Sequence, residues 1–313
     1  MDTIAERISD PRIKLLSYSS LLKLHACPRS YQLYKLNATV EAEEDAEASL
    51  TYAYGHAVGT GIQLCFQGFS YEDTCFYLFC SWSVDLLAED TKRKKSFFLA
   101  LAAIKQFYFL RSNGYLSDWE LVEYNGKPAV ELSFAVSLPN DYCYRGSVDV
   151  VLRNKITSQV MVIECKTSSS QTLNPVEYKN SAQAIGYSIV LDHLFSDLSS
   201  YQVLYLVYLT KTLTWEPITF SKHYVQRALW IRELLLDCEL ITMYSNADVF
   251  PMHGENCINR YYRECEYLNV CTLSTEYITK RLSDIDMKTL EEREATFSIK
   301  VDIQDLISAQ LAK

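Results

Sequence analysis

Two acidic residues and a lysine lie on neighbouring predicted strands. Residues 145–167 read RGSVDVVLRNKITSQVMVIECKT, in which two apolar runs flank a polar turn near 154–159. If the hairpin closes symmetrically about that turn, Asp149 falls opposite Glu164, and facing residues of an antiparallel pair have Cβ atoms about 4.5–5.5 Å apart. Carboxylates that close repel each other unless a cation compensates them, and Mg²⁺ prefers hard oxygen ligands. The spacing therefore predicts a divalent-ion site.

Lys166 follows Glu164 by two positions, so the two side chains share one face of a strand. Its ammonium group would orient a water nucleophile or stabilise charge on a phosphate beside the ion, and the ion would lower the pKa of its bound water. A surface hairpin with one exposed salt bridge is the alternative. The apolar neighbours disfavour it, because such strands are usually buried and buried charges need partners. Cys165 points to the opposite face, where we expect a core thiol.

Composition restricts the class of protein. The chain has 313 residues, of which 49% are hydrophobic, enough to form a core. A net charge of -9 weakens any expectation of tight non-specific DNA binding but leaves room for a local basic channel. The first residues do not resemble a signal peptide, and no stretch of about 18 apolar residues offers a membrane span. We expect a cytoplasmic protein without membrane partners, whose ten cysteines do not form disulfides.

Hydrophobic periodicity predicts helices first, then mostly strands. The order predicts an α/β fold with a mixed central sheet flanked by helices. The predicted helices cover 17–36, with a break near Cys27, and 54–66, 76–87, 96–111, 174–195 and 222–243. The predicted strands cover 121–124, 129–138, 145–153, 160–166, 201–210 and 213–220.

Four further polar residues are candidates for the same site. Gln183 and Tyr187 are four residues apart and share one face of a predicted helix. His56 lies in the motif YGHAVGTGI, and Glu131 lies in AVELSFAV, where its apolar neighbours alternate onto the other face. Each has an ordinary alternative: an amphipathic helix for the pair, a structural histidine, and a solvent-exposed glutamate.

Four cysteines have the spacing of a metal site. Cys257, Cys265 and Cys271 are close together in the sequence, and Cys27 lies far upstream, directly before a proline. Four thiolates fit either a 4Fe–4S cluster or a structural Zn²⁺. Such a site would join the first helix to the end of the core. The alternative is four unrelated core cysteines.

Taken together, GSVDVV followed by VIECKT resembles the D…(D/E)-x-K core of the PD-(D/E)XK nuclease superfamily. The closest resemblance is to the RecB-like branch, which includes AddB-type nucleases, CRISPR adaptation nucleases and many phage exonucleases. It covers most of residues 17–271. It implies a restriction-endonuclease-like core with a mixed central sheet, an N-terminal helical segment and a C-terminal cysteine cluster.

The resemblance also implies roles for residues outside the central motif. Gln183 and Tyr187 match a Q-xxx-Y motif that braces the active site and contacts DNA, and His56 matches a histidine that helps to bind the metal. Glu131 matches an acidic position that would be a further metal or water ligand. Cys27, Cys257, Cys265 and Cys271 match the ligands of a 4Fe–4S cluster. The gap between Cys265 and Cys271 matches the branch, but the gap between Cys257 and Cys265 is wider than in several bacterial members.

We therefore expect four regions: 1–118, helical, with Cys27 and His56; 119–250, the nuclease core; 251–271, the cysteine cluster; and 272–313, a tail. Arg29 and Arg145 lie beside the predicted cluster and active site and would contact the DNA backbone.

The expected function is hydrolysis of DNA by a Mg²⁺- or Mn²⁺-dependent exonuclease. The substrate would be single- or double-stranded DNA. By analogy alone, the setting would be phage or bacterial recombination or repair, in a bacterial or phage-infected cytoplasm, with a strand-annealing recombinase or single-strand-binding protein as partner. The alternatives are a CRISPR adaptation nuclease that trims short DNA, a non-catalytic DNA-binding scaffold, and an electron-transfer iron–sulfur protein.

Overall fold

A mixed sheet forms the centre of the computed structural model, which describes residues 11–36, 46–83, 86, 95–179, 181–195, 199–258, 264–273 and 297–312. Within these residues the strand order is β10-β5-β6-β7-β8-β9, and β1 and β2 also pair with β6. The strands of this sheet are β1 (Leu15–Leu16), β2 (Trp119–Leu121), β5 (Val130–Ser137), β6 (Cys143–Asn154), β7 (Val160–Ser168), β8 (Ser200–Leu209), β9 (Thr214–His223) and β10 (Ile299–Asp302). A separate small hairpin contains β3 (Glu123–Tyr124) and β4 (Lys127–Pro128).

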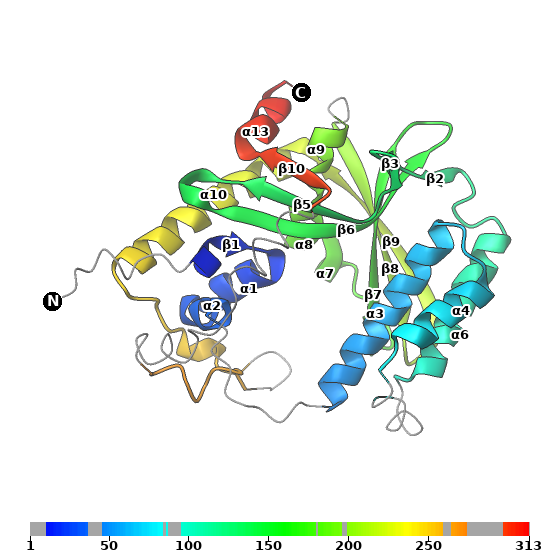
Figure 1. Cartoon of the computed structure of the whole chain (residues 1–313), viewed down its shortest axis with the longest axis horizontal. Coiled ribbons are helices and arrows are strands. Elements are labelled where there is room, and N and C mark those ends of the chain that lie inside the picture. Colours follow the sequence, from blue (N-terminus) through cyan, green and yellow to red (C-terminus); the bar gives the residue numbers. More distant parts are fainter. Residues whose placement is uncertain are drawn as a thin grey trace.

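Helices cover both faces of the sheet, so the predicted α/β class is confirmed (Figure 1). One group packs around β5 and β6, and a second group packs against β7 and β8. The first group contains α1 (Tyr18–Ala26), α8 (Ala182–Ser188), α9 (Leu191–Leu194), α10 (Tyr224–Asn246) and α13 (Ile303–Leu311). The second contains α3 (Ala46–Phe66), α4 (Tyr71–Ser81) and α6 (Phe97–Ser112), while α2 (Pro28–Lys35) lies beside α1 and α7 (Val176–Lys179) precedes α8. None of the described helices is long and apolar enough to cross a membrane.

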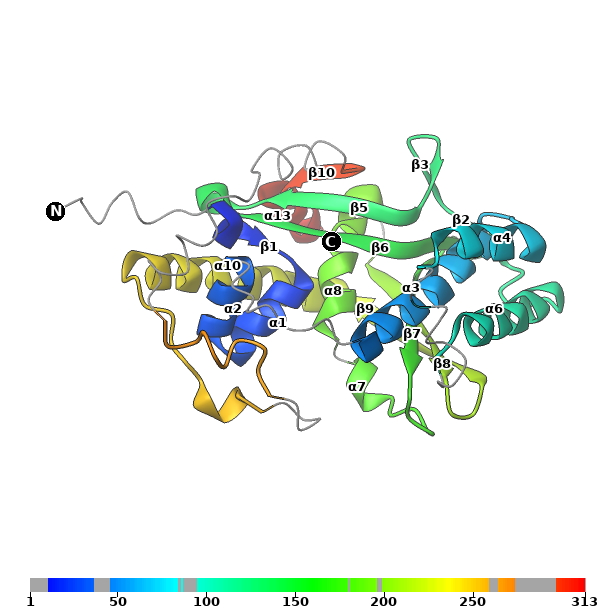
Figure 2. The same ribbon diagram turned by 60° about the horizontal axis from the view of Figure 1, so that its bottom comes forward.

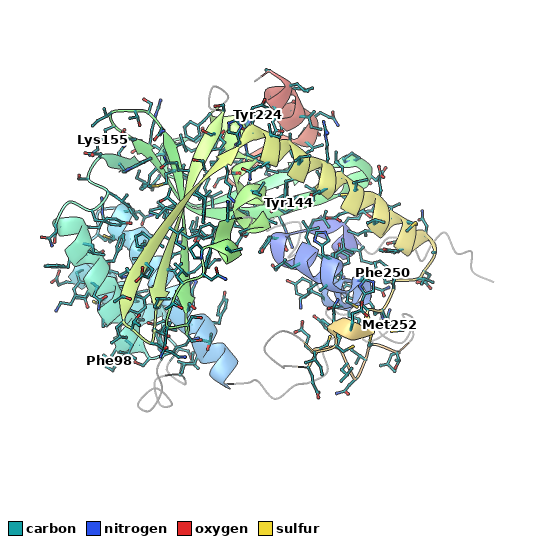
Figure 3. The ribbon with its side chains drawn as sticks, turned by 180° about the vertical axis from the view of Figure 1, so that it is seen from behind. Phe98, Tyr144, Lys155, Tyr224, Phe250 and Met252 are labelled. Atoms are coloured by element: carbon teal, nitrogen blue, oxygen red, sulfur yellow. The ribbon has the colours of Figure 1, made fainter. Side chains whose placement is uncertain are left out.

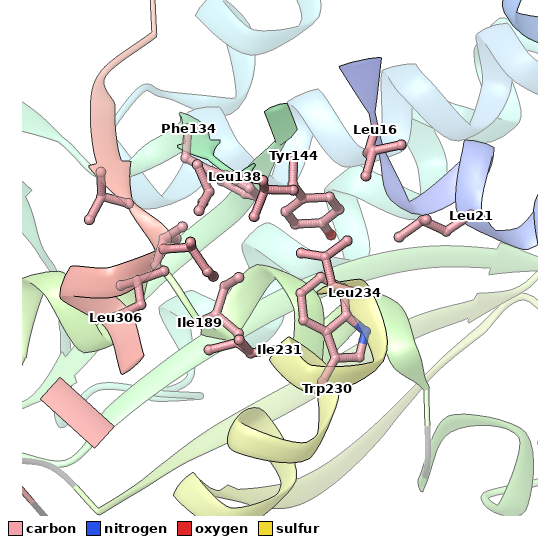
Figure 4. Close-up of a cluster of buried hydrophobic side chains, with 14 of the residues drawn as sticks. Leu16, Leu21, Phe134, Leu138, Tyr144, Ile189, Trp230, Ile231, Leu234 and Leu306 are labelled. Atoms are coloured by element: carbon pink, nitrogen blue, oxygen red, sulfur yellow. The ribbon is translucent and has the colours of Figure 1, made fainter. Parts of the chain in front are cut away.

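The largest core cluster joins segments from the whole length of the chain (Figure 4). Leu16 and Leu21 come from the N-terminal elements, Tyr144 from β6 and Trp230 from α10, and all four are buried. Tyr144 and Trp230 have ring centroids 5.0 Å apart. Because Leu306 of α13 belongs to the same cluster, both ends of the described chain contribute to one core.

The β6–β7 hairpin forms in the predicted register. Arg153 pairs with Val160 and Val150 with Ile163. The turn closes because the Asn154 side chain accepts hydrogen bonds from the backbone N–H groups of Ile156 and Thr157, at 3.0 and 2.9 Å. This is the local capping that favours asparagine in turns.

Two predicted helices are divided. The helix expected over 17–36 breaks at Cys27, as predicted, because Cys27 is extended and Pro28 begins α2. The single helix expected over 174–195 is wrong: α7, α8 and α9 replace it. The backbone of Ser181, with φ -58° and ψ 118°, interrupts the helical path directly before α8.

The predicted tail over 272–313 requires a correction, because residues 299–311 belong to the core. β10 pairs in parallel with β5, with Ile299 opposite Phe134 (Figure 2). The helix that follows, α13, buries Leu306 and reaches Asp192 through Gln310, whose Nε2 donates to the carboxylate at 3.0 Å.

Candidate active site

The candidate site lies where strand β6 changes partners. Its C-terminal half pairs with β7 over Val150–Arg153, and its N-terminal end pairs with β1 at Cys143 and Tyr144. Between these two ladders, residues 145–149 have no strand partner on that edge among the described residues. β7 leaves β6 at this point and continues alongside β8 in parallel.

Glu164 and Lys166 project from the same face of β7, as the spacing predicts. Lys166 Nζ lies 2.5 Å from Glu164 Oε1. The Glu164 side chain is 2% exposed, and its other oxygen, Oε2, is buried without a hydrogen-bond partner in the described structure. Burial lowers the pKa of Lys166, but the nearby Glu164 carboxylate outweighs it, so the pKa lies above its ordinary value.

Asp149 is one residue beyond the last paired position of the hairpin, next in register with Glu164. Its Oδ2 accepts a hydrogen bond from the Cys165 backbone N–H at 3.2 Å, which turns the carboxylate towards β7. Burial, followed by repulsion from Glu164 and Glu131, raises the pKa of Asp149 to about 8. The carboxylate on the neighbouring strand therefore destabilises the charge of Asp149, as the sequence predicted for facing residues.

Glu131 joins this acidic group through a break in β5. Its φ of 46° is unusual for a residue with a side chain, and the predicted alternation fails there: Val130 packs on one face of the sheet, whereas Leu132 packs on the other. Both Glu131 oxygens accept hydrogen bonds, from Gln63 Nε2 at 2.6 Å and from Ser147 Oγ at 2.8 Å.

Gln183 and Tyr187 extend the site onto helix α8. Lys166 Nζ donates to Gln183 Oε1 at 3.1 Å, and Gln183 Nε2 lies 3.5 Å from the Tyr187 hydroxyl. The Tyr187 ring fits against β6 at Gly146, where an added Cβ would lie only 2.9 Å from Tyr187 Cε1. The glycine thus allows the helix to approach the strand closely enough for Gln183 to reach the lysine.

His56 lies on helix α3, which crosses the same end of the sheet. Its ring is exposed and lies parallel to that of Tyr52, with centroids 6.1 Å apart. The backbone of α3 contacts β7 next to it, since an added Cβ on Gly55 would lie 3.6 Å from Thr167 Oγ1. Within the described chain, no group of three or more His, Cys, Asp or Glu side chains is arranged to hold a metal ion.

The four predicted cluster cysteines line one cavity of about 350 Å³. Cys27 lies between α1 and α2, and the chain returns to this region after α10, at Phe250 and Met252 (Figure 3). The backbone N–H of His253 donates to Cys27 Sγ at 3.4 Å. All ten cysteines are free thiols. The cluster cysteines are Cys27, Cys257, Cys265 and Cys271.

The two predicted DNA-contacting arginines differ in location. Arg29 is 7% exposed, and its guanidinium donates to the backbone oxygens of Cys271, at 3.0 Å, and Leu273, at 2.6 Å. Arg29 therefore joins α2 to the segment that contains Cys271. The predicted contact of Arg29 with DNA does not fit this position, because its guanidinium is buried and already hydrogen-bonded. Arg145 is half-buried on the unpaired edge of β6, four residues before Asp149.

Sequence reasoning missed Gln63, Ser147 and Tyr18. Gln63 lies seven residues after His56, so the helical spacing offered a signal for it. Ser147 lies two residues before Asp149 and shares its strand face. For Tyr18 the sequence offered no such signal. In the structure burial raises the pKa of Tyr18, and Lys166 and Glu164 are close enough to influence it.

The family model of the PD-(D/E)XK nuclease superfamily matches residues 15–272. Among solved structures, a candidate exonuclease from Eubacterium rectale is 12% identical, with 82% of this chain and 91% of that chain covered and a TM-score of 0.49. SSO0001 is 13% identical, with 87% and 97% covered and a TM-score of 0.35. No curated protein matches the sequence. The matched range contains both strands of the site and the restriction-endonuclease-like core, and the chain belongs to the PD-(D/E)XK nuclease superfamily.

Proposed function

We propose that this nuclease is a metal-dependent DNA exonuclease whose active site contains Asp149, Glu164 and Lys166. The principal support is Glu164 Oε2, which is buried without a hydrogen-bond partner in the described structure. An unsatisfied buried carboxylate oxygen is costly. A divalent ion would satisfy it and would also offset the burial and the carboxylate repulsion that together raise the pKa of Asp149.

Asp149 and Glu164 fit Mg²⁺ or Mn²⁺. Mg²⁺ is commonly held by one or two carboxylates, with water and substrate phosphate as its other ligands. We assign His56 as a further ligand, because it matches the position of the metal-binding histidine in the RecB-like branch. We assign Glu131 to the outer part of the site, because both its oxygens already accept hydrogen bonds.

The protein groups have distinct tasks in hydrolysis. A bound divalent ion supplies a more acidic water molecule and neutralises phosphate charge. Lys166 would orient the water nucleophile or stabilise charge on a phosphate oxygen with its ammonium group. Gln183 accepts a hydrogen bond from Lys166 and keeps it in position, while Tyr187 supports Gln183. Glu164 itself is buried, so its charge acts away from bulk water and holds the Lys166 ammonium group more strongly.

We place the chain in the RecB-like branch on the strength of Gln183, Tyr187 and the four cysteines. Exonuclease action, in phage or bacterial recombination or repair, follows from this resemblance. So does a strand-annealing recombinase or single-strand-binding protein as partner. The first alternative is a CRISPR adaptation-type trimming nuclease, and the second is a non-catalytic scaffold.

End-labelled linear DNA and covalently closed circular DNA, each single- and double-stranded, test the proposal with Mg²⁺ or Mn²⁺. We expect the wild type to degrade linear DNA progressively, to leave circles intact and to be inactive in EDTA. Lys166→Ala should lose cleavage, whereas Lys300→Ala, on the exposed side of β10, should cleave normally. Cleavage of the circular DNA would show that the enzyme is an endonuclease and not an exonuclease. Trimming that stops after a few nucleotides would favour the adaptation-type enzyme, and binding without cleavage of any substrate would favour the scaffold.

We also propose that Cys27, Cys257, Cys265 and Cys271 hold a 4Fe–4S cluster, with Zn²⁺ as the alternative. The support is that thiols from segments before and after the nuclease core in the sequence line one cavity. The group would stabilise the fold by joining α2 to the segment after α10.

Anaerobically purified protein distinguishes the two groups by visible absorbance and by iron and zinc analysis. Cys271→Ser should lose the bound metal and unfold at lower temperature. Cys80→Ser, at an exposed thiol on α4, should retain both the metal and the melting temperature. Protein with neither iron nor zinc, as purified or after reconstitution, would disprove the cluster proposal.

A further inference from the structure

One stripe of helix α3 leads from the acidic site to the protein surface. Tyr52, His56, Gly59 and Gln63 are separated by four, three and four residues, a spacing that places them on one face of the helix. At the inner end, Gln63 Nε2 donates to Glu131 Oε1 at 2.6 Å. In the middle, no atom lies within 4 Å of a Cβ added to Gly59. The stripe therefore borders open space next to the carboxylates.

The outer end of the stripe carries two exposed rings. Tyr52 is 76% exposed, and His56 is also exposed. Their ring centroids are 6.1 Å apart and their planes differ by 2°. Tyr54, between them in sequence, is fully buried, so the core of this helix does not need the Tyr52 ring. The parallel rings present one aromatic surface to solvent.

The turn of helix α3 that carries both rings lies against β7, the strand that carries the candidate catalytic lysine. Gly55, between the two rings in sequence, brings the α3 backbone against Thr167, the residue after Lys166. A cation is also close: Lys95 Nζ donates to Thr51 Oγ1 at 3.3 Å, on the residue before Tyr52. An aromatic face, a nearby ammonium group and an acidic metal-type site form the combination that binds a nucleotide by its base and its phosphates.

We propose that Tyr52, supported by His56, stacks on an unpaired nucleobase close to the scissile phosphate and makes this nuclease prefer single-stranded DNA. The inference rests on the proposed function, because it assigns the substrate class of the same site. A ring can stack on a base only after the base has left its neighbour. An unpaired strand allows this at little cost, whereas a duplex must first be opened. Stacking does not depend on base identity, so we expect little sequence preference.

Binding in EDTA tests the proposal without cleavage. Fluorescence anisotropy would compare fluorescent oligothymidine with a duplex of equal length. Tyr52→Ala should weaken oligothymidine binding about tenfold and leave duplex binding unchanged, while Tyr52→Phe should keep wild-type affinity. Phe76→Ala, at a 72% exposed ring on α4, is the matched control and should have no effect. The fluorescence of an oligonucleotide that contains 2-aminopurine should fall when it binds the wild type, because the Tyr52 ring stacks on the base. It should fall less when the same oligonucleotide binds Tyr52→Ala.

Cleavage with Mn²⁺ separates this inference from the proposed function. Tyr52→Ala should raise KM for single-stranded DNA more than it lowers kcat. The inference fails if Tyr52→Ala binds oligothymidine like the wild type, if it weakens duplex binding equally, or if Tyr52→Phe is as defective as Tyr52→Ala. A wild type that binds oligothymidine through Tyr52 but never cleaves DNA would disprove the nuclease function alone. A wild type that cleaves while Tyr52→Ala remains unaffected would disprove the stacking role alone.

Discussion

Two buried acidic side chains in this protein have opposite surroundings. Asp192 is fully paired: both its oxygens accept hydrogen bonds from the Arg227 guanidinium, at 2.8 and 2.9 Å, and Tyr201 and Gln310 donate to it as well. Glu164 is as deeply buried, yet only one of its oxygens has a cationic partner and the other has none in the described structure.

The two acidic residues differ in how completely the protein itself satisfies their charge. Arg227 also donates to the Lys222 backbone oxygen at 2.8 Å and lies over the Tyr201 ring at 4.3 Å, so its charge is satisfied by the protein itself. The Asp192 network joins α9, α10 and the C-terminal helix α13. Around Glu164, by contrast, Lys166 is the one basic partner within salt-bridge distance in the described structure, while Asp149 is a second acidic group nearby. An incompletely satisfied acidic group is therefore the more informative sign of a binding site.

The largest effect should follow from breaking the paired network. Arg227→Met leaves Asp192 buried without its cation and should lower the free energy of unfolding by about 3–5 kcal/mol. Urea denaturation measures this, and cleavage per folded molecule should be unchanged. The double variant Asp192→Leu/Arg227→Met should regain part of the loss, because it removes both charges. A single variant as stable as the wild type would contradict the structural role.

Glu164→Gln should have the opposite effects: a large loss of cleavage and no loss of stability. Removing the charge should lower the cleavage rate by about 100- to 1,000-fold, while the melting temperature stays the same or rises, because an amide can be buried at less cost than a carboxylate. Initial rates on labelled DNA and a thermal melt measure the two effects. A large loss of stability with normal cleavage would show that Glu164 belongs to the same structural class as Asp192.

Divalent ions should stabilise only the incompletely paired site. At about 100 times its dissociation constant, an ion contributes about 2.7 kcal/mol to the folded state. Mn²⁺ should therefore raise the melting temperature of the wild type, and EDTA should reverse the shift. Asp149→Asn should lose the response, whereas Arg227→Met should melt lower but keep it. The comparison between the two regions breaks down if Asp149→Asn responds like the wild type.

The smallest effect belongs to a histidine–aspartate pair that joins α1 to α10. His25 Nε2 lies 2.9 Å from Asp237 Oδ2, and this hydrogen bond raises the pKa of His25. Because the pKa of His25 is higher in the folded than in the unfolded state, the pair stabilises the protein fully at pH values below the unfolded-state pKa. This stabilisation is lost as the pH rises through the folded-state pKa. The His25 side chain is 58% exposed, so solvent screening limits the effect to about 0.5 kcal/mol. Urea denaturation between pH 5 and 9 should show the decline, and His25→Gln should abolish it.

The hairpin that carries the site was predictable because its determinants are local. The apolar runs of β6 and β7 and the polar turn at Asn154 determine the register, and the register brings Asp149 next to Glu164 and Lys166. The pairing of Gln183 with Tyr187 follows equally from one turn of helix. Glu131 was predictable as an acidic candidate but not in its orientation, because its positive φ reverses the alternation that strand residues normally follow.

By itself, the amino-acid sequence determined the strand periodicity, the turn and the helix spacing, since these depend on residues only a few positions apart. Only the tertiary structure decided that Cys27 lies beside the cysteines of 257–271, that residues 299–302 form an edge strand, and that Arg29 is buried. The physical reason is that such contacts join segments about 100 or more residues apart, and the packing of the whole core, rather than any local pattern, selects among the many ways in which those segments could meet.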